Sequence, residues 1–125
     1  MKLIAAQILS SPGEIEKNIA KHIDLIHLAA RQGANLVLFP ELSLTGYEPS
    51  LAEVLAVHPN DCRLDEFQVL SDQYGLLISV GAPTKGHQGT EISMITFQPG
   101  LERNPYSKHH LHCDELPFFT PRPQM

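Results

Sequence analysis

The sequence has few cysteines, no excess of basic residues and no long apolar run, and each shortage excludes a class of protein. Its two cysteines, Cys62 and Cys113, are too few for a disulfide framework. The formal net charge is -5, and its nine Lys and Arg form no stripe that could bind nucleic acid. No segment reaches the ~20 apolar residues of a membrane span, and the first residues resemble a strand rather than a signal peptide. We therefore expect a cytoplasmic protein with neither a nucleic-acid nor a membrane partner.

The composition that remains is that of a folded globular chain. Hydrophobic residues make up 42% and charged residues 18% of the 125 positions, which suffice for one domain or part of one. Leu3 to Leu9 is predicted to be a strand. Ser11 then suits a helix N-cap and Pro12 the first helical position. Apolar residues recur at helical spacing until Gly33, which is predicted to end an amphipathic helix; they are Ile15, Ile19, Ile23 and Ile26.

The rest of the chain continues the alternation of strands and helices. "ANLVLF", residues 34–39, is typical of a strand buried on both faces, so a parallel β-α-β unit is expected. Asn60 or Asp61 can cap a second helix, with an apolar stripe of Leu64, Phe67, Leu70 and Tyr74 and an end at Gly75. Residues 76–83 form the next predicted strand, and residues 91–97 and 102–110 a hairpin with Pro105 at an edge or bulge. The fold class is therefore α/β.

Glu41 follows the second strand directly, in "LVLFPELSLTGYEP". Ligands of open α/β sheets bind beyond the carboxyl ends of the strands, and Glu41 lies at such an end. It can be a general base held by a rigid strand end. It can equally be a carboxylate that accepts backbone N–H bonds where the next turn begins. The residue type alone leaves both interpretations open.

Lys108 lies in "NPYSKHHLHCDELPFF", beside several histidines and Cys113. It is either a solvated lysine that leaves an edge strand or a fixed cation for a developing oxyanion. Alternation along a strand would place His110 and His112 on one face and His109 and Cys113 on the other. Because no other Cys or His completes a ligand pattern, no metal site is expected.

These blocks together resemble the nitrilase superfamily of carbon-nitrogen hydrolases. The resemblance rests on Gln7 in the first strand, on "GANLVLFPELSLTGY", on "VGAP" and on "YSKHHLH…PFFTP", and it extends over nearly the whole chain. It implies half of a nitrilase-like α-β-β-α sandwich, made of β-α-β, then α-β, then a β-hairpin. Residues 1–125 would be the N-terminal part of one carbon-nitrogen hydrolase domain.

By the same resemblance, Glu41 matches the general base of the family and Lys108 its oxyanion-stabilising lysine. The family's cysteine nucleophile lies in a turn some tens of residues after the lysine, and no such block is present. Cys113 is too close to Lys108 on the same segment to replace it. Some members use a second carboxylate about eight residues beyond the lysine, where this chain has Leu116 with Glu115 beside it. Glu115 is therefore a candidate, and so are Tyr47 and His110 as residues of the substrate pocket.

The resemblance implies hydrolysis of an amide, a nitrile or an N-carbamoyl compound by Glu, Lys and Cys, with no cofactor. Since this chain would carry only Glu and Lys, it is expected to be inactive alone. An uncovered sheet face should make it pair with a complementing C-terminal half or form a homo-oligomer. The alternative is a non-catalytic module for oligomerisation or ligand binding. A third hypothesis is that the chain is a small independent α/β domain in which Glu41 contacts a ligand.

Overall fold

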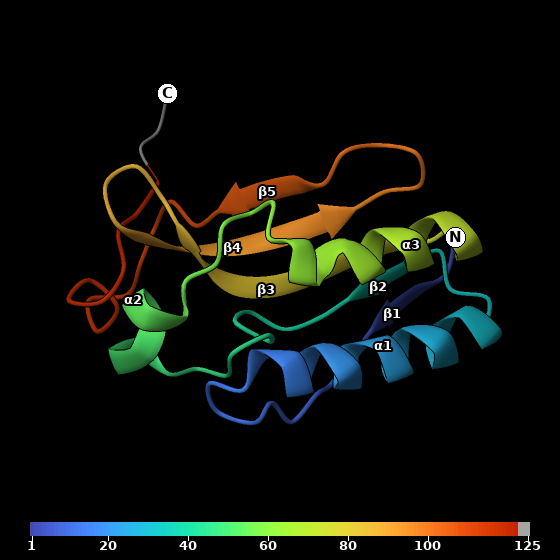
Figure 1. The fold of residues 1–125 in the computed structure, drawn as a ribbon, viewed down its shortest axis with the longest axis horizontal. Helices are drawn as coiled ribbons and strands as arrows, with labels where there is room; N and C mark the ends of the chain where they lie inside the picture. Colours follow the sequence, from blue (N-terminus) through green and yellow to red (C-terminus); the bar gives the residue numbers. More distant parts are fainter. Residues whose placement is uncertain (123–125) are drawn as a thin grey trace.

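The structure is a computed structural model that describes residues 1–122 and contains one mixed sheet with helices along one face (Figure 1). The strands lie in the order β1-β2-β3-β4-β5. The β1–β2 and β2–β3 pairs are parallel, and the β3–β4 and β4–β5 pairs are antiparallel. The strands are β1 (Leu3–Ala5), β2 (Leu36–Leu38), β3 (Leu77–Lys85), β4 (Thr90–Phe97) and β5 (Asn104–Ser107). The helices are α1 (Ile15–Arg31), α2 (Ala52–Leu55) and α3 (Asp65–Tyr74), with 3-10 turns at η1 (Pro49–Leu51) and η2 (Cys62–Leu64). The predicted α/β class and the β-α-β unit are confirmed.

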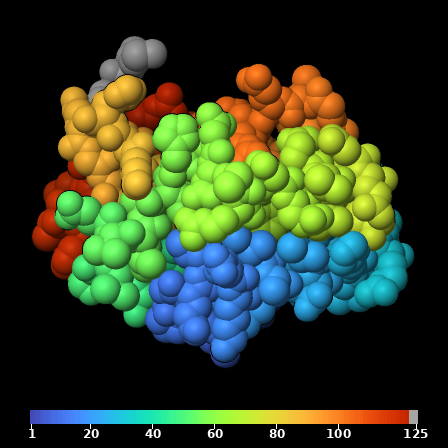
Figure 2. Space-filling view, viewed as in Figure 1, coloured from blue at the N-terminus to red at the C-terminus, as the bar shows by residue number. Residues whose placement is uncertain are grey.

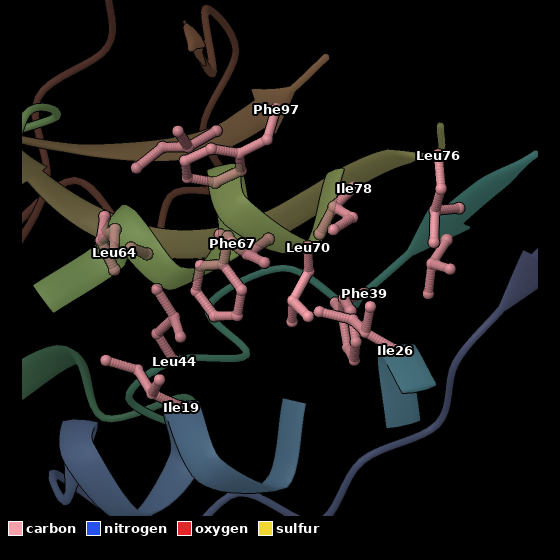
Figure 3. Close-up of a cluster of buried hydrophobic side chains, with 14 of the residues drawn as sticks. Ile19, Ile26, Phe39, Leu44, Leu64, Phe67, Leu70, Leu76, Ile78 and Phe97 are labelled. Carbon is pink, nitrogen blue, oxygen red and sulfur yellow. The ribbon is translucent and has the colours of Figure 1, made fainter. Parts of the chain in front are cut away.

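The main core lies between the sheet and the pair α1 and α3. Figure 3 shows Ile19 and Ile26 of α1 below Phe67 and Leu70 of α3, with sheet residues around them. Val37, Ile78 and Phe97 come from three neighbouring strands and are fully buried. Figure 2 views the molecule from the side on which α1 (blue) and α3 (yellow-green) cover the sheet. No helix within residues 1–122 is long and apolar enough to cross a membrane.

The start of α1 differs from the prediction. The helix begins at Ile15, and no side chain caps its first turn, so Ser11 is not the N-cap. The Asn18 side chain instead bonds the backbone of Ser11. Its amide oxygen accepts from Ser11 N at 2.7 Å, and its amide nitrogen donates to Ser11 O at 2.8 Å. A polar side chain one turn inside the helix thus satisfies the preceding segment. The short motif that predicted Ser11 contains no information about a hydrogen bond from a residue further along the helix.

The second helix follows the prediction more closely. Asp61 caps the 3-10 turn η2 by accepting from Arg63 N at 2.8 Å, and α3 continues from it. Gly75 ends α3 with φ 62, a left-handed conformation that glycine adopts at little cost. Tyr74 was predicted to belong to the apolar stripe but is 38% exposed, and its hydroxyl lies 2.6 Å from His27 Nδ1.

Two predicted strands are shorter in the structure. β1 ends at Ala5 rather than Leu9, because β2, its partner, offers three residues for pairing. β5 ends at Ser107 rather than His110, so Pro105 does lie in an edge strand, and after Lys108 the chain bends at His109 and His110. The predicted alternation of His109 to Cys113 between two faces is therefore wrong.

The face of the sheet opposite α1 and α3 carries exposed apolar side chains. The pairing register places Leu3 and Leu36 together, and Ala5 with Leu38, on this face. Leu3 is 57% exposed, Leu38 40% and Tyr106, on β5, 59%. Because strand residues alternate, Val37 between two of these positions is fully buried against the helices. The helices cover one face of the sheet, whereas the other face is exposed at Leu3, Leu38 and Tyr106 and covered at Ile92, which is buried in a small cluster with Leu42 and Phe119.

A buried histidine interrupts the apolar stripe of α1. His22 is fully buried, and its ring centroid lies 4.2 Å from that of Phe39. Its Nδ1 lies 2.6 Å from Asn18 O and its Nε2 lies 2.8 Å from Ser43 Oγ. Burial lowers the pKa of His22 to about 4, although the bond to Asn18 acts in the other direction. The imidazole is therefore neutral near pH 7.

This low pKa predicts a pH dependence of stability. Between its folded pKa of about 4 and the ordinary value of 6.5, the unfolded chain binds the His22 proton and the folded chain does not. The free energy of unfolding is therefore undiminished by His22 above pH 6.5 and decreases as the pH falls towards 4. The decrease between pH 7.5 and 4.5 is about 2.5 kcal/mol.

Urea unfolding at several pH values measures this contribution. The free energy of unfolding of His22→Gln should fall less than that of the wild type over this interval. The matched control is His87→Gln, at an exposed histidine, which should retain the wild-type slope. Equal slopes for His22→Gln and the wild type would contradict the prediction.

Candidate active site

Glu41 is placed by a turn that leaves the sheet after β2. Phe39 N still donates to Ser79 O at 2.9 Å, but the chain then folds across β3, with Ser43 N donating to Pro40 O at 3.1 Å. Leu42 has a positive φ of 57, which is uncommon for a residue with a side chain. A Cβ at Gly81 would lie 2.5 Å from Leu42 N and against Pro40 O. The turn can approach β3 this closely only because position 81 is glycine.

Two polar residues support this turn and were not among the predicted site residues. Ser43 Oγ accepts from Gly81 N at 3.1 Å, and the same oxygen is bonded to His22. The spacing of His22 did carry a signal, because it falls seven residues after Ile15 and four before Ile26, on the apolar face of α1. A lone histidine on such a face indicates a polar partner in the core.

Lys108 reaches the same place from the far end of the chain. Its backbone N–H donates to Ile92 O at 2.8 Å, which extends the β4–β5 ladder by one bond beyond β5. Its Nζ lies 3.4 Å from Glu41 Oε1, although the two residues are 67 positions apart. The fold thus brings together the two residues singled out from the sequence.

Glu115 completes the group. Its Oε1 lies 3.3 Å from Lys108 Nζ and accepts from His112 N at 3.0 Å, while its Oε2 accepts from the Tyr47 hydroxyl at 3.3 Å. The residue is buried, whereas the neighbouring Leu116 is 55% exposed. The carboxylate beside Lys108 therefore comes from position 115, one residue before the position that the spacing alone indicated.

The charges in this cluster stabilise one another. Burial opposes the charged form of Lys108, but its hydrogen bond to Glu115 and the charge of Glu41 together raise its pKa. Burial likewise disfavours ionised Glu115, yet the donors His112 N and Lys108 hold the pKa of Glu115 below its usual range. Burial and the nearby Glu115 charge raise the pKa of Tyr47, so its hydroxyl remains a proton donor.

The cluster is open to water on one side. The Glu41 side chain is 44% exposed and that of Lys108 28%, while Glu115 beneath them is buried. Both open groups lie on the uncovered face of the sheet: Gly81, beneath the Glu41 turn, pairs with Met94, and Lys108 follows Tyr106 by two residues. The arrangement offers a carboxylate base beside a fixed ammonium group.

The other sequence candidates are His110 and the two cysteines, Cys62 and Cys113. His110 is exposed in the bend after Lys108, and Cys113 is exposed with its Sγ 4.0 Å from Asp114 Oδ1. Cys62 is also exposed, at the start of η2. Within residues 1–122 no three His, Cys, Asp or Glu side chains are grouped so that they could hold a metal ion. The described contacts of Glu41 and Lys108 include no thiol.

The chain is similar to known proteins of two kinds, an NAD(+) synthetase and a protein N-terminal amidase. It is 30% identical to the glutamine-dependent NAD(+) synthetase of Acinetobacter baylyi over 96% of this chain and 23% of that protein. It is 31% identical to the protein N-terminal amidase of Schizosaccharomyces pombe over 89% of this chain and 43% of that protein. It thus spans less than half the length of the curated relatives it matches.

Solved structures show the same likeness. A mutant of the amidase from Nesterenkonia sp. AN1 in complex with butyramide superimposes with a TM-score of 0.83 at 25% identity, covering 99% of this chain and 49% of that one. In another structure of this amidase, the acetamide moiety of fluoroacetamide is covalently added at the active site cysteine. This likeness confirms that the sheet and its helices are a part of the nitrilase fold.

The family model for carbon-nitrogen hydrolases matches residues 3–124, which is nearly the whole chain. Both the Glu41 turn and the Lys108 segment fall within the match. The chain therefore belongs to the carbon-nitrogen hydrolase family.

Proposed function

We propose that this chain contributes the general base and the oxyanion-stabilising cation of a carbon-nitrogen hydrolase, Glu41 and Lys108. The observation that carries the proposal is the approach of Lys108 Nζ to within 3.4 Å of Glu41 in a member of this family. A base must lie within reach of the proton that it removes, and a cation must be fixed near the charge that develops. Glu115 supports the proposal because its Oε1 lies 3.3 Å from Lys108 Nζ, while the Tyr47 hydroxyl donates to Glu115.

The chemistry follows from these residue types together with a cysteine from outside these 125 residues. Glu41 takes the proton of the thiol, and the thiolate attacks the amide carbon. Lys108 stabilises the negative charge on the substrate oxygen, and ammonia or an amine leaves with a proton returned by Glu41. Water activated by Glu41 then hydrolyses the thioester. Lys108 stays protonated throughout, as its raised pKa supports. These steps require neither a metal nor an organic cofactor.

An amide is the substrate class that we propose, ahead of a nitrile or an N-carbamoyl compound. The relatives named above are a glutamine-dependent synthetase, a protein N-terminal amidase and an amidase with bound butyramide. Tyr47 contacts Glu115 of the cluster and His110 follows Lys108 by two residues, and we propose that both face the substrate.

The open sheet face supports a further part of the proposal, namely how the cysteine arrives. Leu3, Leu38 and Tyr106 are exposed on the same face as Glu41 and Lys108. A segment that buries these apolar side chains would also reach the open side of the cluster. We propose that a complementing C-terminal part of the hydrolase domain, carrying the cysteine, packs on this face.

Substitution of the two central residues tests the catalytic assignment. In the natively expressed protein, Glu41→Gln and Lys108→Met should each lower kcat for amide hydrolysis by roughly 10²-fold or more, because one removes the base and the other the cation. Ammonia release reports the rate. The control is Lys85→Met, at an exposed lysine, which should retain wild-type activity. Wild-type turnover by Glu41→Gln would overturn the assignment of the base.

A substrate panel tests the amide assignment. The natively expressed protein should release ammonia from butyramide or glutamine faster than from butyronitrile or N-carbamoylalanine, with its intact mass recorded alongside. Faster release from the nitrile or the carbamoyl compound would contradict the amide proposal. Release from none of them would favour the alternative of a non-catalytic module in oligomerisation or ligand binding.

Two leucines of similar exposure on opposite faces test the packing proposal. Residues 1–125 expressed alone should self-associate or be poorly soluble, and Leu38→Glu on the open sheet face should reduce this. Leu28→Glu is the matched control, since Leu28 on α1 is 45% exposed and Leu38 40%. Light scattering and size-exclusion chromatography measure the association. Equal effects of the two substitutions would show that the open face is not the associating surface.

A further inference from the structure

We infer that His22 and Ser43 are positioning residues that hold the turn of Glu41 against β3 and thereby fix the carboxylate relative to Lys108. The inference rests on the proposed role of Glu41, which it deepens. Neither residue contacts the cluster of Glu41, Lys108 and Glu115 directly. They act through the backbone of the turn, two residues after Glu41.

The direction of every hydrogen bond in this chain of groups is determined. Asn18 O is a carbonyl oxygen and can only accept, so His22 Nδ1 carries the proton in their 2.6 Å bond. In a neutral imidazole Nε2 is then an acceptor, and the Ser43 hydroxyl donates to it at 2.8 Å. Ser43 Oγ in turn accepts from Gly81 N at 3.1 Å. Ser43 Oγ thus donates to His22 and accepts from Gly81, and each of the three hydrogen bonds has a single direction.

Ser43 supplies a hydrogen-bond acceptor where β3 has no neighbouring strand. β2 ends at Leu38, so the Gly81 peptide has β4 on one side and no strand on the other. Its N–H donates to Ser43 Oγ, and its carbonyl accepts from Leu44 N at 2.9 Å. These two bonds, one at the N–H and one at the carbonyl of Gly81, hold the turn against β3. Because buried backbone groups must be paired, the turn has few alternative positions.

Leu42 shows that the turn is held rather than relaxed. Its φ of 57 is unfavourable for a leucine and persists only where the surrounding contacts impose it. Leu42 immediately follows Glu41, so a turn released from Ser43 would change the backbone at the base itself. Displacement of a catalytic group by about 1 Å can cost on the order of 10²-fold in rate.

The test compares two buried serines. Ser43→Ala removes the link to Gly81 and His22, whereas Ser71→Ala removes an equally buried hydroxyl that donates to Leu76 O at 2.7 Å in the end of α3. Both should destabilise the fold, but only Ser43→Ala should move Glu41. In the natively expressed protein it should lower kcat by roughly 10²-fold with little change in KM. Where Glu41→Gln does lower kcat, a kcat for Ser43→Ala equal to that of Ser71→Ala would overturn the inference.

A readout without activity keeps the two proposals separate. The pKa of Lys108, followed by NMR of its Cε, is raised partly by Glu41. Glu41→Gln should lower it, and Ser43→Ala should lower it in the same direction, while Ser71→Ala should leave it unchanged. If Glu41→Gln retains full turnover but Ser43→Ala shifts the Lys108 pKa, the catalytic role fails and the positioning stands. An unshifted Lys108 pKa in Ser43→Ala overturns the positioning alone.

A second variant covers a failure of Ser43→Ala to fold. His22→Leu removes the acceptor for the Ser43 hydroxyl and should give the same shift at Lys108. The ring nitrogens of wild-type His22 supply a separate test, since their ¹⁵N shifts at pH 7 should show a neutral imidazole protonated on Nδ1. Protonation on Nε2 would contradict the direction of the chain and with it the inference.

Discussion

The departure of the chain from the sheet after Leu38 is the constraint on which the candidate site depends. The sheet continues beyond this point, since β3 runs to Lys85 and pairs with β4 along its length. The strand that leaves must still satisfy the groups that it abandons, and Ser43 and Leu44 do so at Gly81. The absence of a side chain at Gly81 lets the turn lie directly on β3. Glu41 therefore sits on backbone that the sheet holds firmly.

The two carboxylates around Lys108 differ in their exposure to solvent. Glu115 is buried, and three donors satisfy it, so it holds the ammonium group of Lys108 from the buried side of the cluster. Glu41 is 44% exposed, and an ion pair in that setting stabilises little. Lys108 is thus held chiefly by Glu115. Glu41 can gain and lose a proton without releasing the lysine, which is what a general base in the proposed mechanism requires.

The sequence was informative where short-range patterns determine the structure. The strands and helices, the end of α3 at Gly75 and the placement of Glu41 at a strand end follow from periodicity, glycine and the β-α-β rule. The pairing of Glu41 with Lys108 across 67 positions came from family resemblance, because no local pattern encodes such a distance.

The errors have physical causes of the same kind. Asn18 replaced Ser11 as the partner of the segment before α1, since a side chain one turn away can serve the same groups. The lysine segment left β5 at Ser107 instead of continuing to His110, so the alternation predicted for His109 to Cys113 does not apply. His22 and Ser43 were missed because their importance lies in a tertiary contact between α1, the turn and β3.

Stability and chemistry make the same demand on the open face of the sheet. Exposed Leu3 and Leu38 favour a cover because apolar surface is removed from water. In the proposed mechanism Lys108 needs the same cover for a different reason, because a cation stabilises a developing anion far less in water than in a dry site. Since the leucines and the cluster share this face, a segment that buried the former would dehydrate the latter. The exposure of Glu41 and Lys108 and the exposure of the leucines are thus two signs of one uncovered surface.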